Sequence, residues 1–385
     1  MTPLLTAVAY GAFANEASYV KIAELLLHHD ANVDLCDNKG HSPLNMAIQR
    51  SYEGLNEHLH HVYSVLGEDP CDRDRAWPTQ FPSERWADAW ASSGRRIAAP
   101  LALIRLFVTH GADVNLRDTF SGSTPLILAA GMQHLNCMVY LLANGAKVDE
   151  PNDTGRTALY ICAEEGHPVT ANLLLDHGAN VNAKMQEGAT PLYIACEFGR
   201  LEVASLLLDR GAIVNAQCED GTTPVSIAAS KGHLDLSRML YERGANIHLA
   251  QNEGATPLFL AAQNNWPDVV EWLLHHDAAV DEPYQGSFTP LVVASQNGNL
   301  DVVKLLVGHG AEIDRVCQGH TALGLAEQCS RAEVASFLRS AGASDIVTST
   351  PTASSRPSEA QMLAMLASHP ELLEGLQDGS NCVTQ

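Results

Sequence analysis

A 33-residue repeat is the feature of this sequence that most constrains its fold. A threonine before Pro or Ala recurs every 33 residues, and one further copy follows after 32. Ser42 and Thr2 take the same place upstream, at irregular steps of 82 and 40 residues, which gives nine copies ending near Ser344. The regular copies start at Thr124, Thr157, Thr190, Thr223, Thr256, Thr289 and Thr321. Such a period predicts stacked units that contact only their neighbours.

Each copy predicts two short helices. Thr followed by Pro and an apolar run is typical of a helix start, because the hydroxyl caps free N–H groups and Pro is tolerated at the first helical position. A second, leucine-rich run, such as "ASLLLDRGA", ends in a residue suited to the left-handed conformation. That residue is Gly178, Gly211, Gly244 or Gly310 in four copies and Asp30 or Asp277 in two others. One unit cannot bury its leucines alone, so stacking is required.

The motif T-P-L-x-x-A, followed by L-L-L-x-x-G-A-x-V-N at this period, resembles the ankyrin repeat family over residues 1–48 and 101–344. The resemblance implies an all-α solenoid of stacked helix-turn-helix units with projecting short β-hairpins. The family often has a His after T-P-L that is expected to bond backbone between repeats, so its absence here is expected to lower the stability between repeats without changing the fold. This sequence instead has Asn45, Ile127, Tyr160, Tyr193, Ser226, Phe259, Val292 and Gly324.

An insertion interrupts the second repeat. Ser42 and Leu106 are 64 residues apart, whereas Thr157 and Leu173 are 16 apart. We therefore place repeat 1 and the first half of repeat 2 in residues 1–48, an insertion at 49–100, and the second half of repeat 2 through repeat 9 in 101–344. The insertion contains Trp77, Trp86 and Trp90. It is either a contact loop with Trp anchors or a loop whose tryptophans pack back onto the repeats.

The C-terminal segment follows a different pattern. Residues 345–358 are rich in Ser, Thr and Pro and are typical of a flexible linker. Residues 359–385 predict a helical tail with two apolar stripes, separated by Pro370. This tail either covers the exposed end of the last repeat or acts as a short partner-binding helix.

Charge and cysteine content narrow the class of protein. The formal net charge is -22, from 45 acidic and 23 basic residues, which disfavours nucleic acid and anionic lipid and favours basic partners. The N-terminal stretch "MTPLLTAVAYGAFAN" aligns with a repeat helix, so we expect neither a signal peptide nor membrane insertion. Cys162 and Cys196 stand where other copies have Ala, which indicates small buried thiols in a reducing compartment, the cytoplasm or nucleus. We expect a monomer.

No catalytic motif, cofactor site or metal site is expected. The sequence lacks nucleotide-binding, metalloprotease, redox and nucleophile-elbow motifs. The histidines of "HLHH" (58–61), near Cys71, are more typical of a solvated loop than of a metal site. These absences favour a non-catalytic scaffold or adaptor that binds another protein. The alternative is the regulatory or targeting portion of a larger enzyme, such as a ubiquitin ligase receptor or signalling enzyme, whose catalytic part is absent.

The ankyrin resemblance implies a partner-binding concave face made of hairpin tips and first-helix ends. Eight of its eighteen positions in repeats four to seven are acidic and two are basic, so we predict a basic and possibly extended partner segment, with Phe198 as an apolar contact. The other interpretation is the solvated face of an acidic protein. The positions are Asp153, Thr154, Arg156, Glu164, Glu165, Gln186, Glu187, Glu197, Phe198, Glu219, Asp220, Thr222, Ser230, Lys231, Asn252, Glu253, Gln263 and Asn264. The resemblance also implies possible hydroxylation at Asn115, Asn182 and Asn215.

Overall fold

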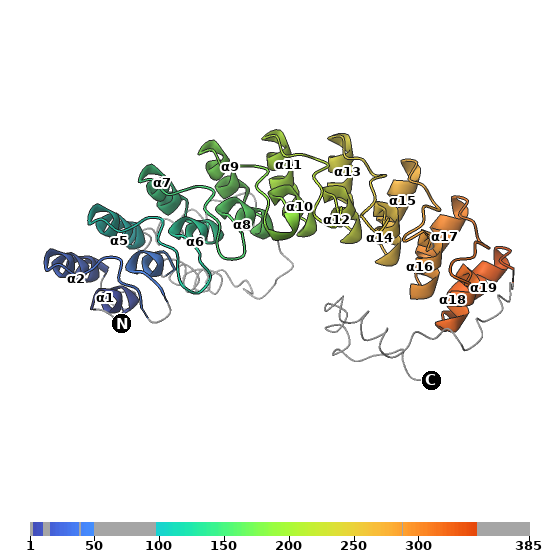
Figure 1. Cartoon of the computed structure of the whole chain (residues 1–385), viewed down its shortest axis with the longest axis horizontal. Coiled ribbons are helices and arrows are strands. Elements are labelled where there is room, and N and C mark those ends of the chain that lie inside the picture. Colours follow the sequence, from blue (N-terminus) through green and yellow to red (C-terminus); the bar gives the residue numbers. More distant parts are fainter. Residues whose placement is uncertain (1–2, 11–15, 38–39, 50–97, 287, 345–385) are drawn as a thin grey trace, which may run out of the picture.

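The computed structural model describes residues 3–10, 16–37, 40–49, 98–286 and 288–344. Throughout these ranges, pairs of short helices stack side by side into an arc (Figure 1). The first helix of each pair lies on the inner side of the arc and the second on the outer side. The described residues contain no β-strand, only two isolated bridges, Tyr284 with Phe288 and Cys317 with His320. The predicted all-α solenoid is confirmed.

The helices alternate regularly along the chain. The inner helices are α1 (Pro3–Tyr10), a helix over 43–49, α6 (Pro125–Gly131), α8 (Ala158–Glu165), α10 (Pro191–Glu197), α12 (Pro224–Ser230), α14 (Pro257–Gln263), α16 (Pro290–Asn297) and α18 (Ala322–Gln328). The outer helices are α2 (Glu16–His28), α5 (Ala98–Thr109), α7 (Leu135–Ala143), α9 (Pro168–Asp176), α11 (Leu201–Asp209), α13 (Leu234–Glu242), α15 (Pro267–His275), α17 (Leu300–Gly308) and α19 (Ala332–Ser340). A short 3-10 turn, η2 (Gln186–Gly188), lies in one connector.

The predicted helix ends are confirmed. The hydroxyl of Thr190 accepts the N–H of Tyr193, and the threonines that start the other regular repeats cap their helices in the same way. The residues expected to adopt the left-handed conformation have positive φ, including Gly211 at 88° and Asp277 at 62°. Local sequence therefore determines where each helix begins and where the chain turns away from it.

One continuous apolar core runs through the stack. Each outer helix from α9 to α17 contributes a fully buried leucine, and each inner helix contributes alanines that let its neighbours approach closely. Those leucines are Leu174, Leu207, Leu240, Leu273 and Leu306. Cys162 and Cys196 are completely buried, as the Ala-like positions predicted. The core forms only between repeats, because a single pair of helices leaves one face of each leucine uncovered.

The irregular regions are partly outside the described residues. The insertion was placed at 49–100, but residue 49 ends a helix and α5 already begins at Ala98, so only 50–97 lie outside the described part. The linker and tail, 345–385, also lie outside it. The first repeat is longer than the regular repeats partly because α2 has 13 residues, whereas α7, α9 and α11 have 9 each.

Side chains at a different position supply hydrogen bonds between repeats. The residue just before an outer helix donates a side-chain N–H to a carbonyl at the end of the inner helix of the preceding repeat. Arg200 Nε donates to the Glu164 carbonyl at 2.9 Å, and Trp266 Nε1 donates to that of Ser230 at 2.8 Å. His167, His233, Asn299 and Arg331 do the same. We call this set the donor row.

A second set of bonds runs along the bases of the connectors. Asn182 accepts the N–H of Ile213 through Oδ1 at 2.9 Å and donates through Nδ2 to the Gly211 carbonyl at 3.2 Å. Asn115 and Asn215 repeat both bonds to their own following repeats. Four aspartates hold the same position and accept a backbone N–H of the next repeat: Asp34, Asp149, Asp281 and Asp314. We call this set the Asn/Asp row.

Candidate functional site: the concave face of repeats three to seven

The connector tips are joined to one another by backbone hydrogen bonds. The N–H of Asp153 donates to Ser121, and the N–H of Glu219 donates to Glu187, at 3.0 and 2.9 Å. The tips of Asp220 and Glu253 are linked to their following repeats, through Asn252 and Gln285, by bonds of 2.8 Å each. These bonds join the tips of repeats three and four to each other, and the tips of repeats five to eight in a second run. We call the row of tips beside the inner helices the ledge.

Two tyrosines lie beside the carboxylates of repeats four to six. Burial raises the pKa of the Tyr160 hydroxyl to about 12, despite the opposing effect of Arg156. The carboxylates of Glu164, Glu197 and Glu187 add to that shift. Tyr193 is affected in the same direction, first by burial and then by Glu197 and other acidic groups. Side chains from three repeats therefore share one electronegative environment on this face.

Three of the predicted acidic residues have a cationic neighbour. Asp153 lies 2.6 Å from Arg117, Glu164 lies 3.1 Å from Arg156, and Glu197 lies 3.6 Å from Lys231. Burial nevertheless raises the pKa of Glu164, with Arg156 opposing and the neighbouring Glu165 and Glu197 reinforcing the shift. Exposed pairs of this kind contribute little to stability. Their effect here is to neutralise part of the predicted acidic surface.

Three of the other predicted acidic residues have no cationic partner among the described residues. Within the described part of the chain, Glu165, Glu187 and Glu219 are exposed and have no Lys or Arg nitrogen within 4.0 Å. Asp220 is exposed too, and its carboxylate accepts hydrogen bonds from the N–H and hydroxyl of Thr222. Glu253 accepts hydrogen bonds from the hydroxyl of Tyr284 and from the Gln285 amide.

For one of the remaining residues, the prediction of a solvent-facing position is wrong. Thr222 is buried rather than facing solvent, because its hydroxyl bonds Asp220 and accepts from Gln251 of the next repeat. Phe198 is 44% exposed at the end of α10, as an apolar contact residue must be. Trp77, Trp86 and Trp90 lie outside the described residues, so their predicted contact role stays a prediction.

The three asparagines predicted as hydroxylation sites all belong to the Asn/Asp row. Asn115, Asn182 and Asn215 each use both side-chain polar atoms to bond the following repeat. Their hydroxylation stays a prediction.

Sequence reasoning missed residues that lie outside the eighteen positions. Arg117 is the cation that pairs with Asp153, and its Nε also donates to the Gly122 carbonyl at 2.9 Å. Phe120, at the tip of the third repeat, is 88% exposed, the largest exposed fraction among the exposed large apolar side chains of the described residues. The sequence does show that the connector carrying Phe120 is one residue longer than a regular one. Eight residues separate Asn115 from the next motif threonine, Thr124, whereas seven separate Asn182 from Thr190.

Features of other site classes were not found among the described residues. No group of three or more His, Cys, Asp or Glu side chains there could hold a metal ion, and residues 58–61 and Cys71 lie outside that part. No helix within the described ranges is both long and apolar enough to cross a bilayer. The seven cysteines of these ranges are free thiols.

Comparison with known proteins decides the family. A model described as "Ankyrin repeats (3 copies)" matches residues 96–185, 183–251, 214–284, 244–317 and 280–349, and the model "Ankyrin repeat" matches residues 1–38. The chain belongs to the ankyrin repeat family. Ankyrin repeats are protein–protein interaction domains that are generally non-catalytic, and residues 1–38 and 96–349 form such a domain here.

Similar proteins agree with this assignment over parts of their length. Ankyrin repeat protein nuc-2 of Neurospora crassa is 30% identical over 143 residues, which are 37% of this chain and 12% of that protein. Ankyrin repeat and SOCS box protein 6 of Mus musculus is 43% identical over 58 residues, which are 15% of this chain and 14% of that protein. The crystal structure of the human ASB11 ankyrin repeat domain aligns with a TM-score of 0.53 and 32% identity, covering 58% of this chain and 99% of that one.

Proposed function

We propose that this ankyrin repeat protein is a non-catalytic scaffold or adaptor that holds a basic, extended segment of another protein along its concave face. One observation carries the proposal: Glu165, Glu187 and Glu219 are exposed on three successive repeats with no cation within 4.0 Å in the described chain. Like charges on one face repel one another, and a basic ligand relieves that repulsion.

The neighbouring groups support a binding surface rather than an ordinary solvated one. The pKa of Glu164 is raised by burial and by the carboxylates beside it, so adding a cation there lowers the free energy of its ionised form. Phe198 provides exposed apolar area beside these charges. The bonds that join the tips of repeats five to eight limit the entropy lost on binding there, because those tips are already ordered.

A charge-reversal variant tests the proposal. The variant Glu165→Lys, Glu187→Lys and Glu219→Lys spares Glu197, which is already paired with Lys231. The probe is a fluorescent (Arg-Gly)5 peptide, measured by fluorescence polarisation at low salt. We expect this variant, called the groove variant below, to bind the peptide about tenfold or more weakly, because three attractive contacts become repulsive. Binding by the unaltered protein should also weaken as salt is added.

A matched control distinguishes binding at the concave face from a general effect of net charge. The control variant Glu24→Lys, Glu242→Lys and Glu271→Lys changes the net charge equally at exposed positions on outer helices. It should bind the peptide nearly as well as the unaltered protein. Equal loss in both variants, or no loss in the groove variant, would show that the concave face is not the binding site.

We further propose a monomer in the cytoplasm or nucleus. The free thiols of the described cysteines support a reducing compartment. Sedimentation of the purified chain tests the first point, and imaging of a tagged full-length chain tests the second. A dimer, or secretion into the medium, would contradict the respective proposal.

The second candidate function is a targeting portion of a larger enzyme. It is favoured by the matches themselves, which span only 12% and 14% of the two curated relatives, one of which is named for a SOCS box as well as its ankyrin repeats. Sequencing of the full transcript tests this candidate. A catalytic domain in the same reading frame would support it, and a stop codon close upstream together with the present C-terminus would exclude it.

A further inference from the structure

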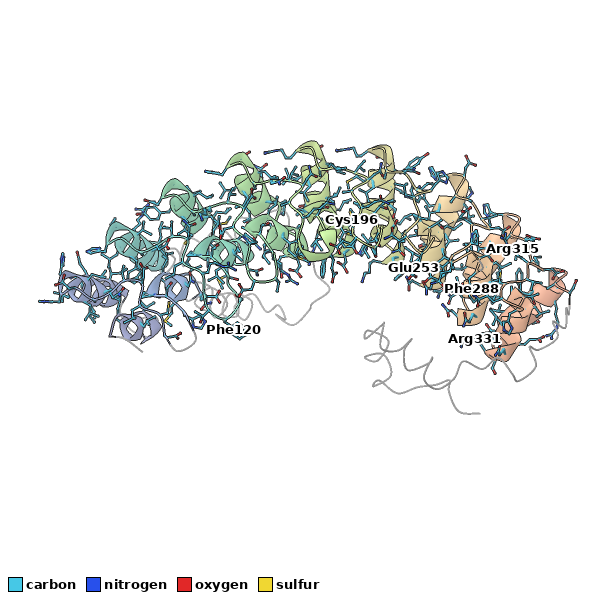
Figure 2. The ribbon with its side chains drawn as sticks, viewed as in Figure 1. Phe120, Cys196, Glu253, Phe288, Arg315 and Arg331 are labelled. Atoms are coloured by element: carbon cyan, nitrogen blue, oxygen red, sulfur yellow. The ribbon has the colours of Figure 1, made fainter. Side chains whose placement is uncertain are left out.

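Phe120 is an exposed aromatic residue on a connector that the rest of the chain holds rigidly. Its side chain is 88% exposed, so a large apolar surface remains in water that burial against a partner would remove. The corresponding tips of the next repeats carry polar residues, including Asp153, Glu187 and Asp220. Figure 2 shows Phe120 and Glu253 along the inner edge of the arc.

A single buried aspartate builds this connector. Asp118 is 7% exposed, and its carboxylate accepts the N–H groups of Phe120, Ser121 and Ser123 at 2.9, 2.6 and 3.0 Å. It also accepts the hydroxyl of Ser121 at 2.9 Å. These bonds to the charged form lower the pKa of Asp118 even though burial raises it. The tip is therefore ordered before any partner arrives.

The connector is also fixed to the tip of the fourth repeat. Ser121 accepts the N–H of Asp153 at 3.0 Å, and Arg117 bonds both the Gly122 carbonyl and the Asp153 carboxylate. The salt bridge neutralises Asp153, which lies between Phe120 and the unpaired carboxylates. Along the ledge, the apolar tip at Phe120 is therefore followed by the tip at Asp153, whose charge is neutralised, and then by acidic tips.

We infer that Phe120 is an apolar anchor at one end of the groove, and that the partner segment combines an apolar residue with basic residues at a set distance from it. This inference rests on the proposed function and adds the spacing between the apolar and basic residues of the partner segment. Packed helices lie roughly 10 Å apart and an extended chain advances about 3.3 Å per residue, so one repeat corresponds to about three residues. Glu187 and Glu219 are two and three repeats beyond Phe120. The basic residues therefore lie about six and nine residues from the apolar one.

Synthetic peptides test the pattern. One probe has Phe at one end and Arg pairs about six and nine residues away, with Gly and Ser between them. Its comparator has Ser in place of Phe. Both peptides are also made with the order of residues reversed, because a bound segment could run in either direction along the repeats. Fluorescence polarisation should show that the Phe peptide, in one direction, binds about tenfold more tightly than the Ser peptide.

Variants at position 120 locate the effect. Phe120→Ser should abolish the preference for the Phe peptide and leave the Ser peptide's affinity unchanged, whereas Phe120→Tyr should retain the preference. The unfolding midpoint of Phe120→Ser should equal that of the unaltered protein, because the ring packs on little else.

The outcomes separate this inference from the proposed function. Equal affinity for the Phe and Ser peptides in both directions, or an undiminished preference in Phe120→Ser, would overturn the anchor while leaving the acidic groove in place. Failure of every arginine peptide to bind would overturn the groove itself, and with it the anchor.

Discussion

The two rows of hydrogen bonds that join successive repeats differ in how much their residues vary. The Asn/Asp row uses Asn or Asp at seven of its positions, because it needs a short side chain that accepts a backbone N–H from the next repeat. The donor row uses His, Arg, Trp and Asn, because it needs only a side-chain N–H that reaches one carbonyl. The need for a short side chain with an acceptor oxygen restricts the residue type to Asn or Asp, whereas the need for one side-chain N–H allows several residue types.

The largest stability effect should come from the asparagines of the Asn/Asp row, each of which makes two bonds to the next repeat. Asn215→Ala removes the bond to the Gly244 carbonyl and the one from the Asn246 N–H, and should lower the free energy of unfolding by about 1–2 kcal/mol. Asn215→Asp keeps the acceptor and should cost about half as much. Urea denaturation measures both. Equal costs for Ala and Asp would mean that the accepted bond contributes nothing.

A donor-row substitution should have a smaller effect. Trp266→Phe keeps an aromatic ring but removes the N–H that bonds the Ser230 carbonyl at 2.8 Å, so we expect a loss of about 1 kcal/mol. Trp266→Arg serves as the control, because arginine makes the same kind of bond at the matching position of other repeats, Arg200 and Arg331. If Trp266→Arg loses as much stability as Trp266→Phe, packing of the indole ring rather than the bond explains the loss.

Acid should weaken the stack through two half-buried histidines, His134 and His167. Burial lowers the pKa of His134 and of His167, so below the unfolded-state pKa of about 6.5 the unfolded chain binds protons more readily than the folded one. Stability should therefore fall as the pH drops from 7 through 6.5 toward the lowered folded-state pKa. Glu164 acts in the opposite direction and at lower pH, since its folded-state pKa is raised from 4.5. Thermal unfolding of a His134→Gln, His167→Gln variant should show a flatter pH profile, and an unchanged profile would contradict this assignment.

The smallest effect is expected at the outer edge of the stack. Arg210 and Arg243 each pair at 2.8 Å with an aspartate of the preceding repeat, Asp176 and Asp209, but all four side chains are substantially exposed. Arg243→Gln should cost on the order of 0.5 kcal/mol at low salt and nothing measurable at high salt. A salt-independent loss would show that the arginine stem, rather than its charge, stabilises the edge.

The sequence by itself determined the repeat, the helix starts and the helix ends. Those features depend on neighbouring residues: the hydroxyl of Thr190 needs only the N–H of Tyr193, and Gly211 needs only its own positive φ. The acidic concave positions could also be predicted, because a fixed period transfers a surface position from one repeat to the next. The period placed Thr222 on that surface wrongly, since its burial depends on contacts to Asp220 and to Gln251 of the next repeat.

The tertiary structure decided which charges are neutralised and how repeats are bonded. Arg117 and Asp153 belong to different repeats, and the sequence gives no distance between their side chains. The donor row likewise joins residues about 36 positions apart, such as Arg200 and the carbonyl of Glu164, through side chains of unlike chemistry. Such pairings follow from the stacking of one repeat on another, and that stacking brings together groups whose local sequences share no common signature.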